Sequence, residues 1–97
     1  MADSVPDEPV RLSAYVHGHV QGVGFRWWTR SRALELGLTG YAANKPDGRV
    51  QVVAQGPREH CEQLLELLTG GDTPGQVDKV ISDWSEPADA IAGFTER

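Results

Sequence analysis

The sequence predicts a single α+β domain in which two helices cover one face of an antiparallel sheet. Three observations lead to this prediction. A chain of 97 residues suits one domain rather than two. Apolar residues switch between a period of two, typical of strands, and a period of three to four, typical of helices. A Pro-Asp-Gly sequence at residues 46–48 marks a tight turn between the two middle strands.

The first strand and the first helix flank a glycine-rich segment. Residues 10–20 alternate between apolar and polar positions, as a half-buried strand does. The first helix is predicted over residues 25–36, and Gly37 stands where a left-handed cap is favoured. Its apolar stripe consists of Phe25, Thr29, Ala33 and Leu36. Trp27 and Trp28 are adjacent, so they cannot both lie on this stripe. One of them packs at its edge or lines the rim of the glycine-rich segment.

The middle of the chain predicts a hairpin and a second helix. Residues 38–44 and 49–55 alternate on either side of the turn. Gly56-Pro57 is predicted to open the second helix, with proline at its first position. Cys61 lies on the apolar stripe of this helix and is interpreted as a core residue, because no catalytic partner is evident.

The end of the chain completes the order of elements. Residues 77–84 predict a fourth strand, and residues 91–96 a possible short fifth strand. The order strand, helix, strand, strand, helix, strand is the ferredoxin-like βαββαβ sandwich, with both helices on one face of an antiparallel sheet. Residues 1–9 are acidic and contain proline, which predicts a flexible tail before a domain over residues 10–97.

Composition argues against several classes of protein. The net charge of −5 disfavours general nucleic-acid binding. An RNA-recognition module needs aromatic residues on its open sheet face, where the third strand here offers Gln51, Val53 and Gln55. No apolar run is long enough to span a membrane, the single cysteine cannot form an intrachain disulfide, and the acidic start is unlike a signal peptide. We therefore expect a cytoplasmic protein without nucleic-acid or membrane partners. We also expect a monomer, although none of these features bears on the oligomeric state.

The segment from Gly18 to Arg26 has the features of an anion site. Its three glycines allow tight turns, and the helix that follows presents free N–H groups and a partial positive charge. Arg26 adds a guanidinium suited to two phosphate oxygens. The segment lacks the Gly-Lys-Ser/Thr ending of nucleotide loops, and Trp27 replaces the third glycine of dinucleotide loops. Local sequence leaves open the alternative of a glycine-rich connection with a surface arginine.

Two further polar features have ordinary interpretations as well. His17 and His19 share one face of the first strand, but no second cluster of metal ligands is evident, so we interpret them as solvent-facing residues and predict no metal site. Asn44 ends the second strand, where an asparagine commonly bonds the local turn backbone.

Two blocks of sequence resemble the acylphosphatase family. The first is Val20-Gln21-Gly22-Val23-Gly24-Phe25-Arg26, and the second runs from Gly40-Tyr41-Ala42-Ala43-Asn44 to Asp47-Gly48-Arg49-Val50. The resemblance extends from about Leu12 to Phe94. It implies hydrolysis of the carboxyl–phosphate bond of small acyl phosphates, without a cofactor, a metal ion or a covalent intermediate.

The resemblance also implies roles for individual residues. Arg26 would bind the phosphoryl oxygens together with the loop amides, and Asn44 would hold the attacking water. The implied phosphate-binding residues are Gln21, Gly22, Val23, Gly24, Phe25 and Arg26. Gly24 stands where some members of the family carry a bulkier residue, which would make the loop more mobile.

Two alternatives stay open beside this activity. A regulatory domain could use the same segment to bind phosphate without turning it over. The same domain also heads hydrogenase-maturation proteins that handle carbamoyl phosphate, a role that we discount because this chain lacks their zinc-binding and nucleotide-binding parts.

Overall fold

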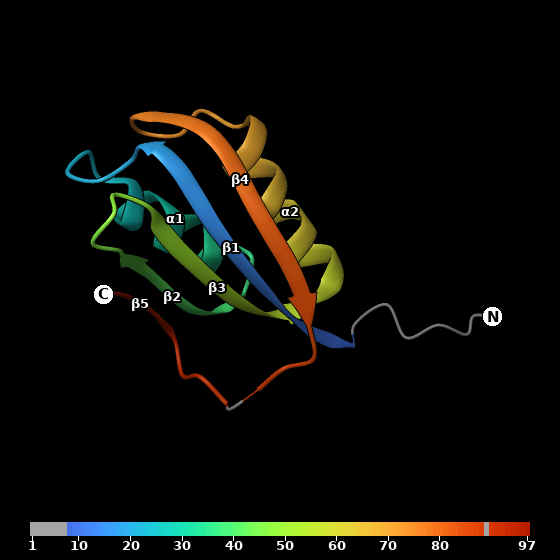
Figure 1. Ribbon diagram of the computed structural model, residues 1–97. Coiled ribbons are helices and arrows are strands. Elements are labelled where there is room, and N and C mark those ends of the chain that lie inside the picture. The colour runs from blue at the N-terminus through green and yellow to red at the C-terminus, as the bar shows by residue number, and fades with distance from the viewer. Residues whose placement is uncertain (1–7, 89) are drawn as a thin grey trace.

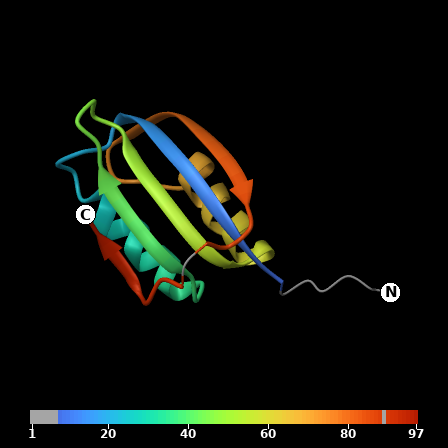
Figure 2. The same cartoon turned by 60° about the horizontal axis from the view of Figure 1, so that its bottom comes forward.

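The computed structural model describes residues 8–88 and 90–97. Its elements in chain order are β1 (Pro9–His19), α1 (Phe25–Glu35), β2 (Thr39–Asn44), β3 (Val50–Pro57), α2 (Arg58–Gly70), β4 (Gln76–Ser85) and β5 (Phe94–Glu96). Both helices lie behind one face of the sheet, α1 beneath β2 and β5 and α2 beneath β1 and β4 (Figures 1 and 2). The predicted ferredoxin-like α+β fold is confirmed. Neither described helix is long and apolar enough to cross a membrane.

The sheet has the strand order β4-β1-β3-β2-β5. The four longer strands pair antiparallel, as predicted. The short fifth strand departs from the predicted antiparallel sheet, because β5 pairs parallel with β2. The physical reason is a long crossing. The chain leaves β4 at one edge of the sheet, runs across to the other edge and enters β5 in the direction of β2 (Figure 2).

The core lies between the sheet and the two helices. Alternate residues of β1 and β3 face the helices and are fully buried, as the period of two predicts. Phe25, Thr29 and Ala33 of α1 are buried against them, which confirms most of the predicted stripe. Leu36, the last predicted stripe residue, caps the helix and is partly buried against the core. Gly37 then adopts φ 71°, the predicted left-handed conformation.

Two predicted boundaries shift in the structure. Pro57 is not the first residue of α2 but the last of β3, and its ψ of 137° is extended. The fixed φ of proline suits an extended residue as well as a helical one, so the sequence alone misplaced it. At the other end of the domain, Pro9 belongs to β1, where it pairs with Pro57, rather than to the predicted tail. Residues 1–7 of that tail lie outside the described residues.

The sheet face opposite the helices is covered in part. Val53 points to this face and was expected to be exposed, yet none of its surface is accessible. Gln55 on the same face is 8% exposed, and its Oε1 accepts a hydrogen bond of 2.9 Å from the N–H of Ala88. For Gln55 the cause is the crossing segment between β4 and β5, which carries Ala88 and which the sequence analysis did not place over the sheet.

Cys61 is a core residue, as predicted, and we expect its thiol to be inert in the folded protein. Its surface is fully buried, and burial raises the pKa of the thiol from 9.0 to about 11. The thiol favours its neutral form in the fold, so this contribution to stability is present below the ordinary pKa and is lost as pH rises toward the folded pKa. Ellman's reagent at mildly alkaline pH should leave the native protein unlabelled and label it after denaturation. Prompt labelling of native protein would contradict this.

Candidate active site

Three segments from distant parts of the sequence meet at one end of the sheet. They are the loop between β1 and α1, the turn that follows β2, and the end of β5 (left side of Figures 1 and 2). The glycine-rich loop leads into Arg26, the second residue of α1, and Asn44 ends β2 directly before the turn. The fold therefore brings together the two residues singled out in the sequence.

The loop reaches the helix through two glycines in the left-handed region. Gly22 has φ 75° and Gly24 has φ 83°. A Cβ at either position would meet nothing within 4 Å, so the backbone conformation rather than crowding calls for glycine there. Because Gly22 and Gly24 carry no side chain, the loop backbone at these two positions is accessible from the hollow described below.

The start of α1 is unusually positive for a helix. Gly24 is its N-cap and supplies no side-chain hydrogen bond, and the first turn contains no acidic residue. The first backbone bond of this turn runs from the N–H of Trp28 to the oxygen of Gly24, so the N–H groups before Trp28 have no helical partner. In α2 the first turn carries Glu59 instead. A helix start with free N–H groups and Arg26 in place of an acid is suited to an external anion.

Arg26 and Asn44 share one hydrogen-bond acceptor. The oxygen of Arg97 accepts a bond of 2.7 Å from Nη1 of Arg26 and one of 3.0 Å from the backbone N–H of Asn44. The N–H of Arg97 donates in turn to the oxygen of Ala42 at 2.7 Å. One turn along α1, Nε of Arg30 donates to the oxygen of Phe94 at 3.0 Å. The β5 segment thus fixes Arg26 relative to the end of β2.

A hollow of about 90 Å³ lies where these segments meet. Its lining consists of Val20, Gly22, Gly24, Phe25, Arg26, Trp27, Asn44 and Glu96. Of the predicted phosphate-binding residues, Gln21 and Val23 are not in this lining. Both predicted catalytic residues are.

The side chains of Gln21 and Val23 point elsewhere and support the loop. Nε2 of Gln21 donates to the oxygens of Lys45 and Arg49, at 2.8 and 3.0 Å. Val23 packs against the edge of the core. Gln21 therefore ties the glycine-rich loop to the turn that follows Asn44.

Asn44 leaves its side chain available. The structure gives it no side-chain hydrogen bond to any residue within 8–88 and 90–97, so it does not serve the turn in the way that asparagines at such positions commonly do. Asp47 performs that task, accepting from the N–H of Arg49 at 3.1 Å and lying 2.6 Å from its Nε. The backbone bond from Arg49, together with the charge of its guanidinium, lowers the pKa of Asp47.

Two further residues, Trp27 and Glu96, line the hollow; the sequence left open whether a tryptophan lies there and did not indicate Glu96. Trp28, not Trp27, packs inward, with its ring centroid 5.9 Å from that of Phe25. The spacing of three residues from Phe25 could have indicated this. Trp27 is left at the hollow with 61% of its surface exposed. Glu96 reaches the hollow through the parallel register of β5 on β2, for which the sequence holds no indication.

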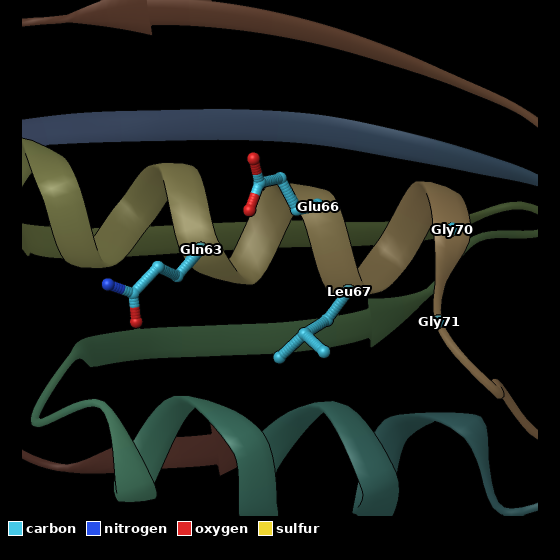
Figure 3. Close-up of a pocket in the computed structure, with 5 residues that line it drawn as sticks. All are labelled: Gln63, Glu66, Leu67, Gly70 and Gly71. Atoms are coloured by element: carbon cyan, nitrogen blue, oxygen red, sulfur yellow. The ribbon is translucent and has the colours of Figure 1, made fainter.

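A larger hollow lies elsewhere on the molecule. It has a volume of about 380 Å³ and is lined by Gln63, Glu66, Leu67, Gly70 and Gly71 of α2 and its C-terminal end (Figure 3). Gln63 and Leu67 point toward α1 there, while Glu66 points the other way. The five described residues of its lining include no cation and no start of a helix, so they lack the groups that bind phosphate. Size alone therefore does not identify the site.

Comparison with known proteins assigns the chain to a family. The profile of the Acylphosphatase family matches residues 12–95, which is most of the chain. The chain belongs to the acylphosphatase family. The match includes the glycine-rich loop, Arg26 and Asn44 within its bounds, and it confirms the resemblance seen in the sequence.

Individual acylphosphatases agree with this assignment. An acylphosphatase of Mycolicibacterium vanbaalenii is 85% identical over 91 residues, which is 94% of this chain and 98% of that protein. The structure of an acylphosphatase from Coxiella burnetii superposes with a TM-score of 0.83 at 33% identity, covering 93% of this chain and 94% of that one. The acylphosphatase from Bacillus subtilis gives a TM-score of 0.85 at 29% identity, covering 91% and 98%.

Proposed function

We propose that this protein hydrolyses the carboxyl–phosphate bond of small-molecule acyl phosphates, giving a carboxylate and inorganic phosphate. The observation that carries the proposal is the placement of Arg26 and Asn44 on one hollow at the glycine-rich start of α1. The loop amides and Arg26 hold the phosphoryl oxygens, and Asn44 positions the attacking water. No metal ion, cofactor or covalent intermediate takes part.

The chemistry suits these groups. An acyl phosphate has a good leaving group, so positioning and stabilisation of charge can suffice for its hydrolysis. The N–H groups at the start of α1 and the guanidinium of Arg26 meet the charge on the equatorial oxygens without rearrangement. The amide of Asn44 both donates and accepts, so it can orient a water without taking its proton.

The proposed step balances without a further reactant. The oxygen of water bonds to phosphorus while the bond between phosphorus and the acyl oxygen breaks. The acyl oxygen leaves as a carboxylate with the electron pair of that bond. Both protons of the water stay on the phosphate, which leaves as dihydrogen phosphate and exchanges protons with solvent.

Hydrolysis of benzoyl phosphate, followed by absorbance with and without a metal chelator, tests this function. We expect fast hydrolysis that the chelator does not change. Acid-quenched samples examined by mass spectrometry should contain no phosphorylated protein. If the folded protein does not accelerate the hydrolysis of benzoyl phosphate above the spontaneous rate, the proposed activity is refuted. Binding of inorganic phosphate in that case would favour a phosphate-binding module.

Gln21 tests whether the loop must be tied to the turn after Asn44. Gln21→Ala removes two hydrogen bonds, and we expect a loss of roughly tenfold in kcat/KM, since misplacement of a binding loop is felt in the transition state. Gln51→Ala substitutes a half-buried glutamine on β3 that does not line the hollow. This variant is the matched control and should keep its activity. Equal kcat/KM for the two variants would contradict a positioning role for Gln21.

A further inference from the structure

Two side chains at the hollow have no part in the proposed binding of phosphate. Trp27 follows Arg26 at the start of α1, and Glu96 ends β5. Both line the hollow, and both are exposed to solvent. A substrate whose phosphate lies at the loop must extend its acyl group outward, toward residues of this kind.

Trp27 is distinguished by its place. Trp27, Leu34 and Ile81 are the large apolar side chains that are exposed within the described part of the chain, at 61%, 44% and 54%. Only Trp27 of these three lines the hollow. Single exposed apolar residues are common and need no explanation, but an indole beside a candidate phosphate site offers a flat apolar surface to whatever the phosphate carries.

Glu96 is distinguished by its unpaired charge. Asp47, in the turn that follows Asn44, is neutralised, since its Oδ2 lies 2.6 Å from Nε of Arg49. Glu96 forms no ion pair with any residue of 8–88 and 90–97, and its strand register places it beside Ala42, two residues before Asn44. A carboxylate at this place opposes the binding of any negative group near it.

We propose that Trp27 and Glu96 select the acyl group of the substrate. Trp27 provides a stacking surface for flat, uncharged acyl groups, of which aromatic ones fit best. Glu96 disfavours acyl groups that carry a second negative charge. The proposal rests on the proposed hydrolysis of acyl phosphates and adds the class of acyl group to it.

The phosphoryl group does not affect the comparison between substrates. Every substrate brings the same phosphoryl group, so the repulsion between Glu96 and phosphate is common to all of them. Only the acyl groups differ, and the ratio of kcat/KM between two substrates isolates that difference. Butyryl and succinyl phosphate form a suitable pair, because their acyl chains have equal length and differ by a terminal carboxylate.

The test measures kcat/KM for benzoyl, butyryl and succinyl phosphate in the wild type and in substituted proteins. We expect Trp27→Ala to lower the ratio of kcat/KM for benzoyl phosphate to that for butyryl phosphate by roughly 3- to 10-fold. Trp27→Phe should keep most of the wild-type ratio. We expect Glu96→Gln to raise the ratio of kcat/KM for succinyl phosphate to that for butyryl phosphate by about threefold at low salt, with a smaller change at high salt. Leu34→Ala and Glu62→Gln, at exposed positions away from the hollow, should leave both ratios unchanged.

Failure of this proposal can be told from failure of the proposed function. A folded wild type that hydrolyses none of the three substrates refutes the function. If the wild type is active and Trp27→Ala keeps the ratio of benzoyl to butyryl phosphate, the stacking role is wrong. An unchanged ratio of succinyl to butyryl phosphate in Glu96→Gln at low salt refutes the role of its charge.

Discussion

Arg26→Ala should lower kcat/KM for benzoyl phosphate by at least about 100-fold, the loss typical of one preorganised contact to a charged transition state. Arg26 lines the hollow and is the only cation among the described residues that do so. Its guanidinium is held at 2.7 Å by the oxygen of Arg97, so it is in place before the substrate arrives. Inhibition by inorganic phosphate should weaken in parallel, because the same group would bind the product.

The conservative variant and a control make this prediction specific. Arg26→Lys keeps the charge but loses the planar fork, so we expect most of the loss to persist. Arg32→Ala removes a cation from the same helix that pairs with exposed Glu35 and lies outside the hollow, and it should stay active. Near-normal hydrolysis by a folded Arg26→Ala protein would exclude a role for the guanidinium in the reaction.

Asn44→Ala should lower kcat by at least about 100-fold while the protein stays folded. The side chain is exposed and makes no hydrogen bond to the described residues, so little stability depends on it. A residue that positions water acts on kcat more than on the binding of phosphate. We therefore expect inhibition by inorganic phosphate to change much less than in Arg26→Ala.

Thermal unfolding and steady-state kinetics together decide the case of Asn44. An unchanged melting temperature with a large loss of kcat supports the positioning of water. Asn44→Asp provides a second variant, because it keeps the acceptor but replaces the donor with negative charge beside the hollow. Turnover close to normal in stable Asn44→Ala protein would remove the proposed role.

The sequence predicted those parts of the fold that depend on local patterns. The period of two in β1 and the stripe of Phe25, Thr29 and Ala33 both follow from burial of alternate or helically spaced residues. Pro57 was misplaced because its fixed φ occurs in strands and at the start of helices alike. The position of β5 could not be predicted, since it depends on where a long crossing segment ends.

The same division applies to the candidate site. Arg26 and Asn44 stand in recognisable blocks of sequence, and the fold brings both blocks to one hollow. Glu96 is adjacent to that hollow only through pairing with a strand more than fifty residues earlier in the chain. The oxygen of Arg97 that accepts from Arg26 belongs to the backbone, so no residue type in the sequence could have indicated this contact. The sequence therefore indicated the residue types of the candidate site, but not the pairing of strands that lie far apart in the chain.

The shared acceptor at Arg97 has a consequence for how the enzyme responds to heat. The guanidinium of Arg26 and the backbone N–H of Asn44 both donate to the oxygen of Arg97, which directly follows β5, a strand of three residues at the edge of the sheet. Edge segments with few bonds open at lower free energies than the core around them. Fraying of β5 would release the guanidinium of Arg26 while the helices and the four longer strands, with Asn44 at the end of β2, stayed packed. Activity would then be lost in a single step below the melting temperature of the domain, and it would return on cooling.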